Sequence, residues 1–166
     1  GEYLGSYAPY GYKKSKEQKN KLEVDENVSK IVERIFELYE EGNGFQKIAT
    51  ILDNENVITP SKYLGMSHQR ESWSPKTIRA ILINEAYIGN TVQNKCTSIS
   101  YKIKKKRKKN PEEYIRVENT HNAIISRELF YKVQEMIKSK KNVSLPKHNF
   151  LLKGLLFCHN CKRKLR

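Results

Sequence analysis

The chain has 166 residues, enough for one medium-sized domain or two small ones with a real hydrophobic core. Its 32 Lys and Arg residues against 18 Asp and Glu give a formal net charge of +14, which favours nucleic acid, and next an acidic membrane surface, as the partner. No apolar run approaches the ~20 residues of a membrane span, nothing resembles a signal peptide, and three cysteines favour metal binding in a reducing cytoplasm over a disulfide framework.

Residues 1–24 are rich in Gly, Tyr and Lys and predict an extended arm followed by a turn or short hairpin. The residues that exclude a helix here are Gly5, Pro9 and Gly11. An arm of this kind can follow a DNA minor groove, and Ser6 and Tyr7 are the candidate contacts. Tyr10 and Tyr12 are expected instead to pack onto the helix that follows.

Two amphipathic helices come next. Apolar residues at i, i+3 and i+4 predict a helix from about Asp25 that stops at Gly42. Its inward positions are Val28, Ile31, Val32, Ile35, Phe36 and Tyr39. A second helix is predicted to begin near Asn43 or Gly44, with Phe45, Ile48, Ala49 and Leu52 as its apolar stripe. It ends within residues 54–60, and a polar loop over residues 61–72 is expected to follow.

The segment 73–84 predicts a short helix with a sharp start. Ser74 is a good N-cap, and Pro75 suits the first helical position because its missing N–H costs nothing there. Ile78, Ile81 and Leu82 fall on one face at helical spacing. The remaining surface presents Lys76, Thr77, Arg79, Ala80 and Ile83.

The second and third helices together suggest a helix-turn-helix, in which one helix braces on phosphates and the next lies in the major groove. The candidate base contacts are Lys76, Thr77, Arg79 and Ala80; Ser74 would hold a phosphate, and Gln46 and Lys47 are candidates on the bracing helix. The turn is long for a simple helix-turn-helix. The alternative is an ordinary helical hairpin whose polar face is solvated.

The pattern changes after Asn84. Strands are predicted over residues 87–93 and 114–117, with the basic loop K-I-K-K-K-R-K-K at 102–109 between them. Lys104, Lys105, Lys106 and Arg107 are candidate phosphate contacts, which position a protein without reading sequence. The alternative is a solvated loop. Ser126 then caps a last helix, with Leu129 or Phe130, Val133, Met136 and Ile137 directed inward.

The chain ends in a basic linker and a C-x-x-C pair. Cys158 and Cys161 have the spacing of one zinc knuckle, which is half of a four-ligand site. A thioredoxin-like redox pair is the alternative, although no βαβ context surrounds it. Cys96 is expected to be a buried or otherwise neutral thiol. The sequence shows no carboxylate pair, Gly-rich phosphate loop or nucleophile constellation, so we expect no catalysis by this chain alone.

Seven segments in order carry a family resemblance. They are P-Y-G-Y (9–12), V-x-x-I-F-x-L-Y (32–39), F-Q-K-I-A-T-I-L-D (45–53), I-T-P (58–60), W-S-P-K-T-I-R-A-I-L-I-N-E-A-Y-I-G (73–89), T-H-N-A-I-I-S-R-E-L-F (120–130) and F-L-L-K-G-L-L-F-C-H-N-C (150–161). With these the chain resembles the central recombinase domain of large serine recombinases. That resemblance implies a preceding catalytic domain whose serine attacks DNA and a following zinc ribbon. The knuckle departs from the family's C-G-x-C-G, since His159 and Lys162 replace the glycines.

We therefore expect an α+β fold, with a helical front half that holds a helix-turn-helix-like pair and a back half of small β-sheet plus helix. The expected parts are the arm (1–24), a recombinase DNA-binding domain (25–140), a linker (141–149) and the truncated start of a zinc ribbon (150–166), with remaining zinc ligands beyond Arg166. No metal is expected to be firmly bound here, and the catalytic serine domain is expected to be absent from this chain.

The expected function is recognition of an attachment half-site in double-stranded DNA, which positions a separate catalytic domain for strand exchange. Other recombinase protomers would be partners of the full-length protein, a cytoplasmic protein encoded by a bacterium or phage, with no membrane association. The alternative is a protein–protein interaction module of the synaptic complex with only non-specific DNA affinity. An RNA-binding domain is a weaker alternative, because the aromatic sheet pattern of RNA-binding modules is missing.

Overall fold

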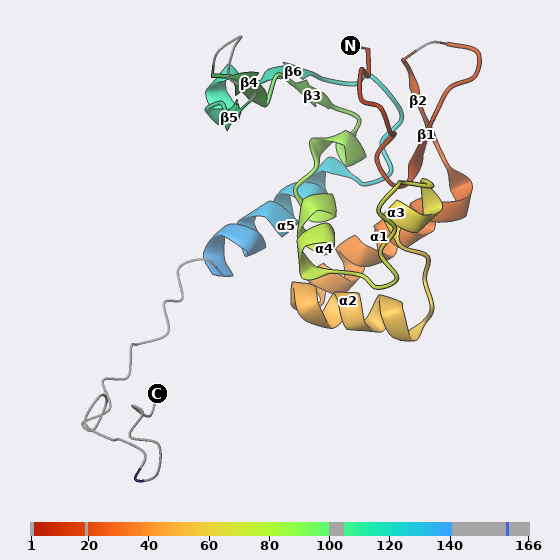
Figure 1. The fold of residues 1–166 in the computed structure, drawn as a ribbon, viewed down its shortest axis with the longest axis vertical. Coiled ribbons are helices and arrows are strands. Elements are labelled where there is room, and N and C mark those ends of the chain that lie inside the picture. Colours follow the sequence, from red (N-terminus) through yellow and green to blue (C-terminus); the bar gives the residue numbers. More distant parts are fainter. Residues whose placement is uncertain (1, 19, 100–104, 141–158, 160–166) are drawn as a thin grey trace. The chain divides into compact units, whose positions relative to one another are not determined.

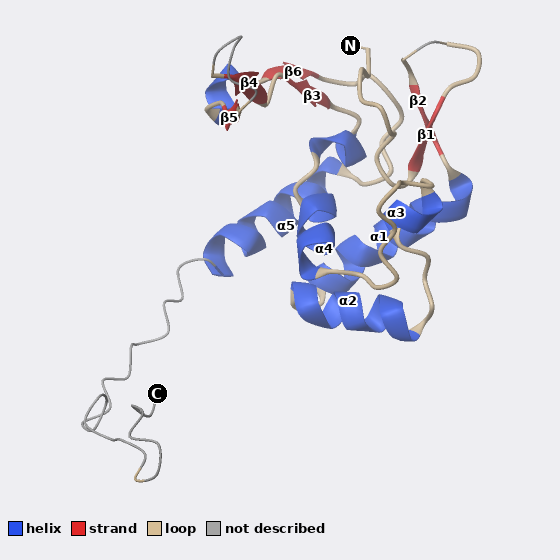
Figure 2. Cartoon of the chain, viewed as in Figure 1, coloured by secondary structure: helices blue, strands red, loops and turns tan. Residues whose placement is uncertain are grey.

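A computed structural model describes residues 2–18, 20–99, 105–140 and 159. The chain divides into two units, one that ends at Met136 and one that begins at Ile137. Five helices, short 3₁₀ turns and paired strands in the described residues confirm the α+β class (Figures 1 and 2). The described strands form three separate two-stranded antiparallel ribbons.

The N-terminal segment forms the predicted hairpin. Strand β1 (Tyr12–Lys14) pairs with β2 (Leu22–Val24) in antiparallel register. The preceding arm is held against the domain: the Tyr3 N–H donates to the Asn20 carbonyl at 2.7 Å, and the Gln93 side chain donates to the Glu2 carbonyl. Tyr10 and Tyr12 are buried, but their ring contacts are with Tyr63 and Trp73 and with Tyr87 and His121 rather than with the helix that follows. The arm therefore belongs to the same compact unit as the helices.

Three helices form the core of the front half. They are α1 (Glu26–Glu40), α2 (Phe45–Asn54) and α4 (Pro75–Leu82). Their predicted apolar faces lie inward. Phe36 on α1 and Leu52 on α2, for example, have no exposed surface. In Figure 1, α4 runs across the direction of α2 with its lower end next to that helix, and the two helices make close contact. The segment expected as polar loop contains one further helix, α3 (Pro60–Tyr63), which begins at a proline in the first helical position.

The N-terminus of α1 is fixed by a buried carboxylate. Asp25 is the N-cap, and its side chain accepts from the Asn27 N–H at 3.2 Å and from the Tyr63 hydroxyl at 2.6 Å. The Tyr63 hydrogen bond is the main reason that the pKa of Asp25 lies below its usual value. The short helix α3 is thereby linked to the start of α1.

The back half departs from the prediction at two places. Residues 87–93 do not form one strand: η1 (Glu85–Ile88) is a 3₁₀ turn that ends at Gly89, and only β3 (Thr91–Gln93) is extended. The expected basic loop contains β5 (Lys106–Lys108), which pairs with β4 (Cys96–Ser98). A 3₁₀ turn η2 (Pro111–Glu113) leads to β6 (Ile115–Val117), which pairs with β3. The helix α5 (Arg127–Lys140) follows as predicted.

Candidate nucleic-acid interface

Helix α4 is held rigidly at its N-terminus. Ser74 is the N-cap as predicted, and its hydroxyl oxygen accepts from the Thr77 N–H at 3.2 Å. Trp73 is buried, and its backbone N–H donates to an Asp53 carboxylate oxygen at 2.7 Å. The indole N–H donates to the Val57 carbonyl at 2.9 Å. These bonds connect the start of α4 to the C-terminal end of α2.

The opposite face of α4 is open. Lys76, Arg79 and Ala80 are exposed, and Ile83 just after the helix has 46% of its surface exposed. Lys76, Ala80 and Ile83 follow one another at i, i+4 and i+7, so they form one row along the helix surface. Thr77 is only partly exposed, and its hydroxyl lies 2.9 Å from that of Ser74. The structure thus brings four of the predicted contacts to one helix and leaves the Thr77 side chain already engaged.

The turn η1 is joined to the β3–β6 ribbon by a half-buried polar network around His121. The His121 Nε2 lies 2.7 Å from the Ala86 carbonyl, so this nitrogen must carry the proton. Its Nδ1 then accepts from the Thr120 hydroxyl at 2.8 Å. Burial is the main cause of a lowered pKa for His121. The network holds a neutral imidazole, which is a structural role and not a catalytic one.

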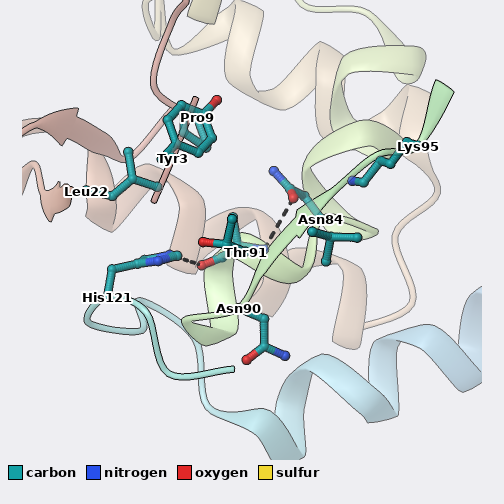
Figure 3. A pocket seen from close by; sticks show the side chains of 10 residues that line it. Tyr3, Pro9, Leu22, Asn84, Asn90, Thr91, Lys95 and His121 are labelled. Carbon is teal, nitrogen blue, oxygen red and sulfur yellow. Dashed lines mark hydrogen bonds between the residues drawn. The ribbon is translucent and has the colours of Figure 1, made fainter. Parts of the chain in front are cut away.

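A small cavity of about 180 Å³ lies beside this network (Figure 3). Tyr3 and Pro9 of the arm line it on one side, and Asn84, Thr91 and His121 on the other. Its volume is below the roughly 300–1,000 Å³ of pockets that bind drug-sized ligands. It lies between the arm and β3, and Lys95 also lines it.

In the β4–β5 ribbon, the side chains of the basic run alternate between the two faces. Cys96 is paired with Lys108, Thr97 with Arg107, and Ser98 with Lys106. Because directly opposed residues point to the same side of a ribbon, Lys106 and Lys108 share the face of Cys96, whereas Arg107 lies on the other. All six side chains are exposed, so the expectation of a buried Cys96 is wrong. Lys105 is also exposed, and Lys104 lies outside the described residues.

The remaining predicted contacts are placed less closely together. Ser6 and Tyr7 are exposed, and the Tyr7 carbonyl accepts from the Tyr3 hydroxyl at 2.6 Å. Gln46 and Lys47 are exposed in the first turn of α2. The structure therefore leaves all four accessible.

The described cations differ in whether they form ion pairs. Several cations outside α4 and β5 are neutralised by carboxylates: Arg34 by Glu55, Lys62 by Glu71, Arg116 by Glu85, Arg127 by Glu118 and Lys132 by Glu40. Lys76, Arg79 and Lys108 have no ion pair with any other described residue. Other described cations, such as Lys14, Lys21 and Lys30, also have no ion pair, so the missing ion pairs leave the α4 and β5 cations available to a polyanion without by themselves marking the interface.

Sequence reasoning missed two basic groups near α4. Lys95 precedes β4, and Lys108 belongs to β5; both are exposed. Lys108 belongs to the basic run, but nothing in the sequence distinguishes it from the other lysines of that run. Lys95 is a single lysine with no motif around it, and only the tertiary structure places it near Ile83.

The predicted metal ligands lie elsewhere. Cys158 and Cys161 are outside the described residues. Among the residues that the structure does describe, no three His, Cys, Asp or Glu side chains are grouped so as to hold a metal ion. The helices in that part of the chain also include none long and apolar enough to cross a bilayer.

Two curated proteins of Bacillus subtilis (strain 168) are similar to this chain. A putative DNA recombinase is 30% identical over 164 residues, which covers 92% of this chain and 31% of that protein. The uncharacterized protein YefB is 30% identical over 112 residues, which covers 68% of this chain and 37% of that protein. The chain thus spans about a third of the length of these relatives.

Two solved structures share the fold. One is an LSR–DNA complex, with 24% identity and a TM-score of 0.56 over 99% of this chain and 44% of that one. The other comes from work on the sequence requirements of the Listeria innocua prophage attP site, with 24% identity and a TM-score of 0.55 over 99% of this chain and 58% of that one. The family model described as Recombinase matches residues 26–140. The resemblance read from the seven sequence segments is confirmed, and the chain belongs to the Recombinase family.

Proposed function

We propose that this domain binds double-stranded DNA by placing the exposed face of α4 in the major groove. The observation that carries the proposal is the asymmetry of α4: one face is fixed in the core, while Lys76, Arg79 and Ala80 remain exposed. A helix about 10–12 Å in diameter fits a major groove about 12 Å wide. Neither basic side chain of this face forms an ion pair with a described carboxylate, so both are available to bases or phosphates.

The whole protein is then a site-specific serine recombinase, in which this domain recognises an attachment half-site and positions a separate catalytic domain. The support is the family membership, the relative called a putative DNA recombinase, and the fold shared with an LSR–DNA complex. Other protomers of the same recombinase would be its partners during strand exchange. The basic ribbon would add affinity through phosphates, and the exposed arm residues Ser6 and Tyr7 would reach the adjacent minor groove.

A binding titration tests the half-site claim. A preferred duplex is first selected from a randomised pool, and its affinity is compared with that of random duplex at two salt concentrations. If Arg79 makes a bidentate base contact, Arg79→Ala costs about 1–3 kcal/mol on the preferred duplex and less on random DNA. Lys30→Ala, which removes an exposed charge from α1, is the matched control.

The possible outcomes separate the candidate roles. Equal losses on both duplexes for Arg79→Ala would make Arg79 a phosphate contact. If selection yields no duplex bound more tightly than random DNA at either salt concentration, the half-site claim is wrong. The domain would then be the protein–protein module of the synaptic complex.

We also propose that Cys158 and Cys161 supply two thiolates of a zinc site in the full-length protein. Both lie outside the described residues, so the proposal rests on their C-x-x-C spacing. Zinc bound by four ligands would stabilise the following segment and take no part in chemistry on DNA. Metal analysis of the full-length protein, compared with a Cys158→Ser, Cys161→Ser variant, should show the loss of one zinc per chain.

A further inference from the structure

A groove of about 520 Å³ runs between the end of α4 and the β-ribbons. Ala80 of α4 and Ile83 just after it line one side, and Val92 of β3 and Tyr114, which precedes β6, line the other. We call this the α4–ribbon groove. Ile83 contributes an apolar side chain of which 46% of the surface is exposed.

The groove continues the row of residues that α4 presents to solvent. Ala80 belongs both to the Lys76–Ala80–Ile83 row and to the groove wall. The groove is therefore not a separate pocket but the flank of the proposed reading helix. A helix that fills a major groove has a sugar–phosphate backbone on each side, so one DNA strand must pass along such a flank.

The charge of the groove suits a phosphate backbone. Lys95 and Lys108 stand on its ribbon side, and Lys106 lies on the same face of β5 as Lys108. The carboxylate that lines the groove, Glu85, is neutralised by Arg116 at 3.3 Å. The wall thus carries two lysines and one already paired acid, while the apolar floor matches the apolar surface of a deoxyribose or a thymine methyl group.

We propose that the α4–ribbon groove receives the sugar–phosphate backbone of one DNA strand, with Lys95 and Lys108 on its phosphates and Ile83 against its sugars. This inference rests on the proposed function, since it needs α4 to bind duplex DNA. On this proposal Lys108 contacts a phosphate because its side chain lies on the groove face of β5. The Arg107 side chain lies on the other face and makes no contact in the groove.

Cys96 offers a direct test, because it lines the groove and is exposed. The chain is treated with iodoacetamide, with and without enough preferred duplex to give a complete gel shift. Alkylation is measured by mass spectrometry on the peptide that contains Cys96. DNA in the groove should slow this reaction about tenfold, since the reagent then reacts only when the contact opens.

A matched variant distinguishes direct coverage of Cys96 by DNA from the long-range electrostatic field of the DNA. The Cys96→Ser, Thr97→Cys double variant moves the thiol to the opposite face of the same strand, where DNA bound in the groove leaves it accessible. Its alkylation should be slowed much less. Equal slowing of both thiols would overturn the proposal, because it would reflect only the field of the DNA. Unchanged Cys96 reactivity under a complete gel shift would also overturn it.

Salt dependence provides a second measurement. Loss of one phosphate contact reduces the slope of log K against log salt by about 0.9, so Lys108→Gln should show a fall of this size. Arg107→Gln removes the same charge from the other face and should show a smaller fall, and Lys30→Gln controls for net charge. Equal falls for Lys108→Gln and Arg107→Gln would refute the assignment to the groove. If the unaltered protein gives no gel shift at all, the proposed DNA binding itself fails, which is a distinct result.

Discussion

The bond between Asp53 and Trp73 should be the strongest single constraint on the start of α4. The Trp73 backbone N–H donates to the Asp53 carboxylate at 2.7 Å, and Trp73 is only 5% exposed. Asp53→Ala would leave this buried donor without a partner, which costs about 1–3 kcal/mol in the free energy of unfolding. For a domain of this size, that loss corresponds to a fall in the melting temperature of roughly 3–10 °C. Asp53→Asn keeps an acceptor oxygen and should lose less.

Thermal and urea unfolding followed by circular dichroism measures this loss. Glu71→Gln is the control, since it removes a carboxylate that is 83% exposed and should change the free energy of unfolding by less than about 0.5 kcal/mol. Amide exchange at Trp73 should accelerate in Asp53→Ala before the core of α1 does. An Asp53→Ala variant as stable as the Glu71→Gln control would refute the reasoning that this bond fixes α4.

Three other substitutions test the fold around the interface. Gly89→Ala should destabilise by more than about 2 kcal/mol in urea unfolding, because φ is +84° and a Cβ would lie 2.7 Å from the His121 carbonyl oxygen. Tyr63→Phe removes the bond that lowers the pKa of Asp25, so its cost should be full above about pH 4 and should shrink as the pH falls through the lowered pKa; a cost independent of pH would contradict this. The pKa of His121 is lowered, so the neutral ring contributes stability that is complete above about pH 6.5 and is lost at lower pH. A His121→Gln variant should therefore show a flatter pH profile of stability between pH 7 and 5.

The helical front half could be predicted from sequence because its signals are local. Apolar spacing located α1, α2 and α4, and the Ser74–Pro75 pair fixed the start of α4 at the correct residue. The sequence predicted a strand where η1 lies because Ala86, Tyr87 and Ile88 are three consecutive apolar residues. All three are buried, so no alternation of apolar and polar residues distinguishes a turn from a buried strand. Its caps were readable, however, since Asn84 accepts from the Ala86 N–H and Gly89 has a positive φ.

The β4–β5 ribbon could not be predicted in the same way. None of its residues is buried, so no alternation of apolar and polar side chains appears in the sequence. The pairing of Cys96 with Lys108 joins residues twelve positions apart in the sequence, and no apolar pattern indicates that register. The sequence therefore identified a basic run without showing that its members point in two directions.

The two interpretations of the basic run, a solvated segment and a phosphate clamp, are compatible once the ribbon is known. Exposed lysines along an edge strand such as β5 prevent pairing with other chains, which accounts for their solvation. Preventing such pairing does not require Lys95 and Lys108 to line the groove opposite Ile83. It also does not require the groove carboxylate, Glu85, to be neutralised by Arg116. Lys106 and Lys108 lie on the same face of β5, so their like charges oppose formation of the ribbon, and none of its residues is buried to offset that cost. A polyanion in the groove removes this repulsion, so the same charges that weaken the free ribbon would stabilise it on DNA.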